Sequence, residues 1–121
     1  MKKIISQNIH VAVFICLLLV TVLASHFASA QNIKGEQLTQ EKRCYACHHM
    51  TQTLIGPPYN AIAARHNGKT EKDMVARALA RKIILGGGGS WGVIPMFPNE
   101  HVSEDEAIEI SNWILGLSDS R

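Results

Sequence analysis

The sequence predicts an all-α domain of about four short helices. In residues 31–121, apolar side chains recur at helical spacing in four segments, and no strand pattern of alternating apolar and polar residues competes with them. The segments are separated by irregular stretches that contain Gly and Pro, which interrupt helices. A chain of 121 residues is long enough for one domain of ordinary size and too short for two.

The first two predicted helices are short. Residues 35–42 lead to two cysteines, and Leu38 is the main apolar anchor of this segment. The Gly-Pro-Pro sequence at residues 56–58 cannot continue a helix, so an irregular stretch is expected there. Residues 59–66 then predict a second helix, with two residues on its inner side, Ile62 and Ala63.

The third predicted helix begins near residue 70. Thr70, with Asp73 three residues later, resembles a capping box, and Gly86 is a natural C-terminal stop. Met74 is expected to face the core. The residues of this segment that fall at helical spacing are Met74, Ala78, Arg81 and Leu85.

The last predicted helix runs from residue 103 to about residue 117. Ser103 and Glu106 form a second capping box, and the residues that share one face are Ala107, Ile110, Ile114 and Leu117. Four modest helices with long connections leave a thin core. We therefore expect something besides side chains to fill the middle of the domain.

Residues 1–30 resemble a secretory signal peptide. The segment starts with positive charge, residues 11–24 form an apolar run, and Ala-Ser-Ala at residues 28–30 is a tripeptide of the kind that signal peptidase cuts. An uncleaved membrane anchor is the alternative, but a span needs about 20 apolar residues and this run is shorter. We expect an exported chain that begins at Gln31 and retains two of the three cysteines.

The charge of the mature chain excludes one class of partner. Residues 31–121 hold ten Lys or Arg residues and ten Asp or Glu residues. Nucleic-acid binding needs a strong basic excess, so no nucleic-acid partner is expected. We also expect no membrane span after residue 30.

The sequence CYACH at residues 44–48 is the main functional motif. Cys-x-x-Cys-His is the attachment signature of a c-type haem, in which two thiols reach the two vinyl groups and the following histidine ligates iron. A thioredoxin-like redox pair would sit beside a strand, and a zinc site would need a second pair of ligands. We therefore predict one haem c bound covalently through Cys44 and Cys47, with His48 as an axial ligand.

Met96 is the predicted second axial ligand. A low-spin electron carrier needs a ligand from the opposite face of the haem, and a methionine there raises the reduction potential. Pro95 and Pro98 fix backbone dihedrals on either side of Met96 and forbid helix, so the thioether is presented with less entropy to lose.

Other ligands fit this role less well. Met50 is too close in sequence to His48 to reach the opposite face, and Met74 lies at a helix position where methionine usually packs. A bis-histidine centre with a lower potential is the alternative. It would use one of two residues at helix edges, His66 or His101.

Further residues complete the predicted site. A ligating histidine usually donates its other ring N–H to a carbonyl oxygen, and the turn at residues 56–58 offers that of Pro57. The haem propionates need donors, for which the candidates just ahead of Met96 are Trp91, Arg81 and Lys82. Each of these three also has a plain structural interpretation: packing for the tryptophan, and a solvated helix end for the two cations.

Four stretches together resemble a known family. CYACH, IGPPY, WGVIPMFPN and the final helix VSEDEAIEISNWILGL are similar to the small bacterial monohaem class I cytochromes c, over residues 38 to 117. The resemblance implies a compact all-α fold wrapped around one covalently attached haem. It also implies a periplasmic, monomeric, non-enzymatic protein that carries single electrons between exported redox partners.

The resemblance also assigns residues. Cys44 and Cys47 become the thioether sites and His48 and Met96 the axial ligands. Phe97 departs from the family, because relatives commonly have another proline there, and the glycine run at residues 86–89 is a second departure. The remaining assignments are Pro57 as acceptor from His48, Trp91 as propionate donor, Asn99 as donor near the Met96 sulfur, and Trp113 as packing near the haem.

Two functions besides that of a free carrier stay open. One is a small enzyme or gas-binding sensor whose bond to Met96 is weak or displaced, because a mobile, glycine-rich loop would open that position. The other is a subunit that docks permanently in an oxidase or reductase complex.

Overall fold

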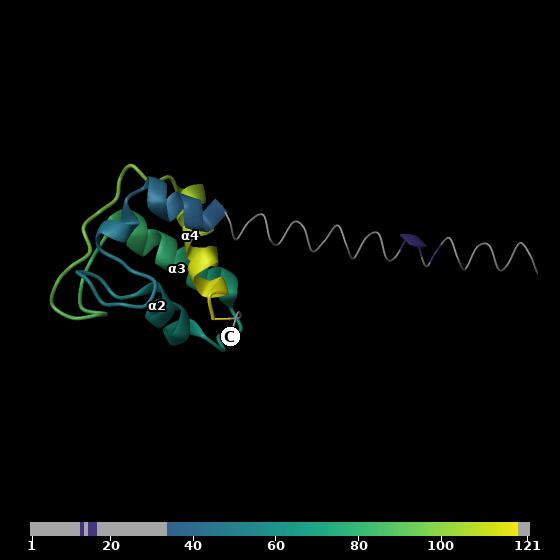
Figure 1. Ribbon diagram of the computed structural model, residues 1–121, viewed down its shortest axis with the longest axis horizontal. Helices are drawn as coiled ribbons and strands as arrows, with labels where there is room; N and C mark the ends of the chain where they lie inside the picture. The colour runs from purple at the N-terminus through teal and green to yellow at the C-terminus, as the bar shows by residue number, and fades with distance from the viewer. Residues whose placement is uncertain (1–12, 14, 17–33, 119–121) are drawn as a thin grey trace, which may run out of the picture. The chain divides into compact units, whose positions relative to one another are not determined.

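The computed structural model describes residues 13, 15–16 and 34–118 (Figure 1). The predicted signal peptide and its cleavage site lie outside these residues, apart from residues 13, 15 and 16. The chain divides into two units, Met1–Ala30 and Gln31–Arg121, and the second unit carries the elements described below. No helix of the described residues is long and apolar enough to cross a membrane.

The described part of the second unit is built from four α-helices and one short 3-10 helix. Residues 34–41 are helical, and no strand occurs in residues 34–118, only an isolated antiparallel bridge between Gly87 and Met96. The predicted all-α fold of about four short helices is confirmed. The other elements are η1 (Cys44–Ala46), α2 (Tyr59–His66), α3 (Lys72–Leu85) and α4 (Glu104–Gly116).

Helix α4 is the centre of the domain, because it packs against both α2 and α3 (Figure 1). The predicted capping box at its start is confirmed. Glu106 N donates to Ser103 Oγ at 3.3 Å, and Ser103 N donates to Glu106 Oε2 at 3.0 Å. The predicted apolar face is buried except at its end, where Leu117 is half-buried, and the further buried residues of the helix are Ser111, Trp113 and Leu115.

Helix α3 differs from its prediction in two respects. Its N-cap is Glu71, whose side chain makes no capping hydrogen bond, so the capping box predicted from Thr70 is wrong. Asp73 is one methylene shorter than the Glu or Gln that a capping box uses to reach back. The buried face is also not the predicted one: Met74 is 61% exposed, whereas the buried residues are Ala76, Ala80 and Ile83.

The small residues of α3 explain this reversal. Two sets of residues on α3 recur at the same helical spacing. The set that contains Met74 has the larger side chains, so it resembles a core face in the sequence. Burial of Ala76 and Ala80 instead lets the backbone of α3 approach α4 closely, because alanine has only a methyl group.

The helix at residues 34–41 is joined to α4 at both of its ends. A Cβ on Gly35 would overlap Trp113 Cβ, so only glycine permits this approach. Lys42 Nζ, just after the helix, lies 2.8 Å from Glu106 Oε1. As predicted, Leu38 is buried, and so are Ile62 and Ala63 of α2.

Candidate functional site

The two cysteines of the CYACH motif stand on one tight turn. Cys44 begins η1, and its carbonyl oxygen accepts from Cys47 N at 3.1 Å and from His48 N at 2.9 Å. Both thiols are free and half-buried. Burial raises the pKa of the Cys44 thiol, which keeps it protonated. The turn therefore presents two thiols and a histidine from five consecutive residues.

His48 is held in one orientation by a hydrogen bond. The residue is 8% exposed, and Nδ1 lies 2.7 Å from the carbonyl oxygen of Pro57. A carbonyl can only accept, so Nδ1 carries a proton, and in the neutral ring Nε2 then keeps its lone pair. The predicted hydrogen bond to Pro57 is confirmed. It leaves His48 in the tautomer that a metal-ligating Nε2 needs.

Gly56 makes room for that ring. A Cβ built on Gly56 would lie 2.5 Å from His48 Cε1 and 2.8 Å from Nδ1. Gly56 N also donates to Cys47 O at 2.8 Å, which folds the segment back over the motif. The sequence predicts Gly56 only as a helix breaker, so this contact is new. The position of Gly56 just before the predicted acceptor Pro57 is the signal that could have indicated it.

Tyr59 is a second site residue that was not predicted from the sequence. Its ring stacks on His48 with centroids 5.6 Å apart and an interplanar angle of 24°. It also contacts Trp113 edge to face, with centroids 4.9 Å apart. Burial raises the pKa of the Tyr59 hydroxyl. Trp113 thus contributes to the site through Tyr59, in keeping with its expected structural role.

Met96 is positioned by its backbone. Met96 N donates to Gly87 O at 3.0 Å, and Gly87 N donates to Met96 O at 2.9 Å. The Met96 side chain is partly buried and packs against the hydrophobic core. Gly86 ends α3 with φ 69°, and a Cβ on it would overlap Met96 O. The glycine run therefore pairs directly with the backbone of the predicted ligand, which its composition alone does not indicate.

Asn99 closes the loop of residues 86–99. Its backbone N donates to Ile84 O, and its amide Nδ2 donates to the carbonyl oxygens of Ile83 and Phe97, all at 3.0 Å. An amide has two N–H donors. The predicted donation to the Met96 sulfur therefore requires Asn99 to give up one of these bonds. In the structure, Asn99 connects the end of α3 to the segment after Met96 through these hydrogen bonds.

The three predicted propionate donors all lie at the surface. Trp91 is 45% exposed, and Arg81 and Lys82 are exposed on the last turns of α3. Lys82 extends over the loop, because a Cβ on Gly87 would lie 2.7 Å from Lys82 Nζ. Trp91 has a partner from α2, since the Arg65 guanidinium carbon lies 4.6 Å from the centroid of its ring.

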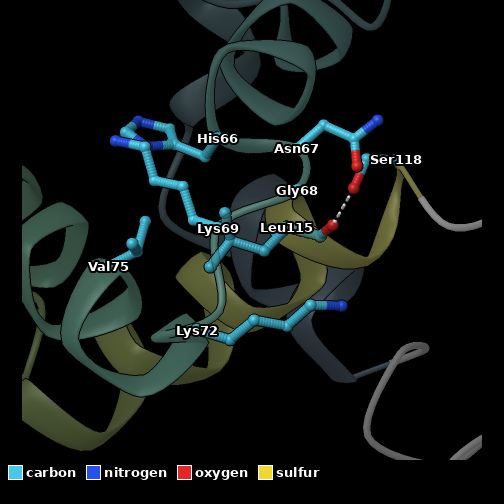
Figure 2. Close-up of a pocket in the computed structure, with 8 residues that line it drawn as sticks. All are labelled: His66, Asn67, Gly68, Lys69, Lys72, Val75, Leu115 and Ser118. Carbon is cyan, nitrogen blue, oxygen red and sulfur yellow. Dashed lines mark hydrogen bonds between the residues drawn. The ribbon is translucent and has the colours of Figure 1, made fainter.

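His66, the competing ligand on α2, borders a separate small pocket (Figure 2). The pocket has a volume of about 10 Å³, room for about one water molecule, and is lined by residues 67–69, by Val75 and by Leu115. His66 Nδ1 is buried and has no hydrogen-bond partner within the described residues. Burial, followed by nearby positive charges, lowers the pKa of the ring. His66 also borders a second, more open pocket of about 480 Å³, whose lining includes neither the CYACH turn nor Met96.

The competing histidine and methionine ligands do not share the position of Met96. His101 is exposed, Met50 is partly buried and packs against the core, and Met74 lies on the exposed face of α3. Among the described residues, no group of three or more His, Cys, Asp or Glu side chains is arranged to hold a metal ion. The CYACH turn therefore lacks the further ligands that a structural zinc site needs.

The residues of the two loops fit a covalently attached haem. The CYACH turn supplies two free thiols and a histidine with an available Nε2, and the second loop supplies a thioether. Apolar surface for a macrocycle is present on both loops, which extend to the same side of the domain in Figure 1. The exposed apolar residues there are Leu54, Ile55, Val93, Ile94 and Phe97. Fold and site together define a c-type cytochrome.

Comparison with known proteins agrees with this class. Residues 33–118 match the family Cytochrome c. The chain is similar to cytochrome c-551 of Azotobacter vinelandii, 42% identical over 81 residues that cover 67% of this chain and 94% of the relative. It is also similar to cytochrome c-552 of Nitrosomonas europaea, 41% identical over 100 residues that cover 78% and 94%. A crystal structure of wild-type Nitrosomonas europaea cytochrome c552 superimposes with a TM-score of 0.63 at 39% identity, covering 68% of this chain and 98% of that one.

The chain belongs to the cytochrome c family. It is an electron-transfer protein that carries one haem c, attached through Cys44 and Cys47, and exchanges electrons with redox partners. Axial ligation by a histidine and a methionine is typical of this family, and the chain has both residues in suitable segments.

Proposed function

We propose that the protein is an exported, periplasmic electron carrier whose haem iron is ligated by His48 and Met96. The observation that carries this proposal is the 2.7 Å contact between His48 Nδ1 and the Pro57 carbonyl oxygen. It fixes the ring and leaves Nε2 as the free ligand atom. In this proposal residues 1–30 are a signal peptide that is removed, and the mature protein is a monomer.

Met96 is the better second ligand for three structural reasons. It is partly buried against the core, whereas Met74 is 61% exposed on α3. Its backbone is paired on both sides with Gly87, so the residue is held without a side-chain hydrogen bond. The two pockets that His66 borders are lined by no residue of the CYACH turn or of the Met96 loop.

The protein's own residues set the conditions for electron transfer. A haem supplies a metal centre that takes up and releases one electron, and the chain supplies ligation, burial and hydrogen bonds that set the potential. Trp91, Arg81 and Lys82 are proposed to donate to the propionates from the last turns of α3 and the loop after it. His48 and Met96 would together leave the iron without a position for a substrate, so we propose that the protein is not an enzyme.

The ligand assignment is tested by the ferric absorption spectrum of purified Met96→Ala protein. Wild type should show a low-spin haem with a weak sulfur-to-iron charge-transfer band, and this band should disappear in Met96→Ala. Met74→Ala is the matched control, because it removes an exposed methionine and should leave the band intact. A band that persists in Met96→Ala would remove Met96 as the ligand.

Ligand binding to the purified wild-type protein distinguishes a carrier from a gas-binding sensor or a small enzyme. A closed, six-coordinate site should bind carbon monoxide and cyanide slowly. Rapid binding by the wild-type protein would favour the sensor or enzyme, in which the Met96 bond opens easily.

A further inference from the structure

The tip of the Met96 loop is held by one side chain from another helix. Arg65, in the last turn of α2, donates from Nη1 to the carbonyl oxygen of Ser90 at 2.6 Å. Its guanidinium carbon also lies 4.6 Å from the ring centroid of Trp91. One planar group therefore contacts two consecutive residues of the loop, one by a hydrogen bond and one by a cation–π contact.

The rest of the loop tip lacks side-chain anchors. Residues 87–95 are all exposed, and Gly87, Gly89 and Gly92 have positive φ angles. Glycine-rich segments lose much conformational entropy when they are ordered, so they open easily unless something holds them. The backbone pair of Gly87 and Met96 fixes the base of the loop, and Arg65 reaches its tip.

We propose that Arg65 is a positioning residue for Met96. It holds the loop tip against α2, and so it keeps the methionine in place and slows the entry of other ligands at that position. This inference rests on the proposed ligation by Met96. It goes beyond it by assigning control of the loop to a residue on another helix.

Arginine is specific for this task. A lysine keeps the positive charge but has no planar face to stack on the indole and presents a point charge instead of a fork of donors. The contacts lie at the surface, where a cation–π contact and a charged hydrogen bond each have a modest effect, so their loss should change opening by about five- to tenfold in total.

The experiment measures the rate of cyanide binding to the ferric holoprotein for wild type and three variants. Arg65→Met keeps the aliphatic length and removes both contacts, and it should speed binding about five- to tenfold. Arg65→Lys should fall between Arg65→Met and wild type. The matched control is Arg77→Met, which removes the same charge from an exposed position of α3 and should bind cyanide at the wild-type rate.

Three outcomes would overturn the proposal. The first is a rate for Arg65→Met that is within about twofold of wild type, against the expected five- to tenfold change. The second is an equal increase in Arg77→Met, because the effect would then be one of net charge. The third is an Arg65→Lys rate equal to wild type, because charge alone would then suffice.

A second measurement separates this inference from the ligand assignment. The indole N–H resonance of Trp91 should shift in Arg65→Met and stay in place in Arg77→Met, whatever residue ligates the iron. If the wild-type spectrum lacks the sulfur-to-iron band, the ligation proposal fails by itself. If the band is present and the indole resonance does not move in Arg65→Met, the positioning role of Arg65 fails.

Discussion

Residues 47–58 and residues 86–99 each present one of the two proposed iron ligands, and they hold it in different ways. His48 is held in position by contacts to its side chain: Pro57 accepts from Nδ1, Gly56 lies against the ring, and Tyr59 stacks on it. Met96 is held in position by its backbone, which makes two hydrogen bonds to Gly87. A change in the packing around its ring should therefore act on His48, and a change that loosens the loop backbone should act on Met96.

The two segments also differ in solvent exposure. His48 is 8% exposed, whereas the neighbours of Met96 in the loop are open to solvent, with Val93 97% and Phe97 77% exposed. Loops with few buried contacts open at a lower free-energy cost than packed segments. The difference indicates which ligand leaves first: His48 should stay on the iron under conditions in which Met96 is displaced.

The largest expected effect comes from Gly86→Ala in the Met96 loop. Gly86 has φ 69° and ψ −153°, a conformation that suits only glycine, and an added Cβ would overlap the carbonyl oxygen of Met96. We expect a loss of about 3 kcal/mol or more in the free energy of unfolding, because strain and a backbone clash combine. Denaturant titration of the ferric holoprotein measures the loss, and cyanide binding should also become faster.

Gly89→Ala is the matched control for this prediction. Gly89 also has a positive φ, 87°, but a Cβ there would meet nothing within 4 Å. It should cost only the left-handed backbone penalty, about 1–2 kcal/mol. Equal losses in the two variants would show that contact with the Met96 backbone does not matter.

Gly56→Ala tests how His48 is held, and it should have a smaller effect than Gly86→Ala. The added methyl group would push the His48 ring, which then has to shift away from the Pro57 carbonyl. Overpacking of this kind costs about 1–3 kcal/mol. The ring protons of His48 should shift in the NMR spectrum and the reduction potential should change, while the rate of cyanide binding at the Met96 side should stay near wild type. An unchanged His48 signal, or faster cyanide binding, would contradict the division between the two loops.

Much of this arrangement could be predicted because it depends on local patterns. The spacing of CYACH, the capping box of Ser103 and Glu106, and the Gly-Pro-Pro turn each occupy a few consecutive residues. The turn also led to the correct acceptor for His48, because a carbonyl at Pro57 is within reach after a short irregular segment. The helices followed from side-chain periodicity in the same way.

The parts that could not be predicted depend on contacts between distant segments. The bridge between Gly87 and Met96 is made by backbone atoms, which leave no side-chain pattern. The contact from Arg65 to Ser90 joins residues 25 apart. Periodicity alone favours the row of α3 that contains Met74, because the close approach of α3 to α4, which favours alanine, is a tertiary property.

The smallest expected effect comes from Glu106, which joins the residue after the first helix to the start of α4. Its carboxylate accepts from Ser103, which follows the Met96 loop, and pairs with Lys42, which precedes the CYACH motif. The hydrogen bond with Lys42, followed by that with the Ser103 backbone, lowers the pKa of Glu106 to about 2. Glu106→Gln should therefore destabilise the protein near neutral pH.

The pH dependence of the destabilisation in Glu106→Gln tests whether the charge of the carboxylate causes it. Because the pKa of Glu106 is lower in the folded protein than its ordinary value of 4.5, the stabilisation is complete above that value and is lost as the pH falls towards about 2. The difference in unfolding free energy between wild type and Glu106→Gln should shrink across this window. Glu104→Gln removes the same charge from an exposed position in the same turn, and it should cost less at neutral pH. A gap between wild type and Glu106→Gln that stays constant down to pH 2 would show that the carboxylate acts by its shape and not by its charge.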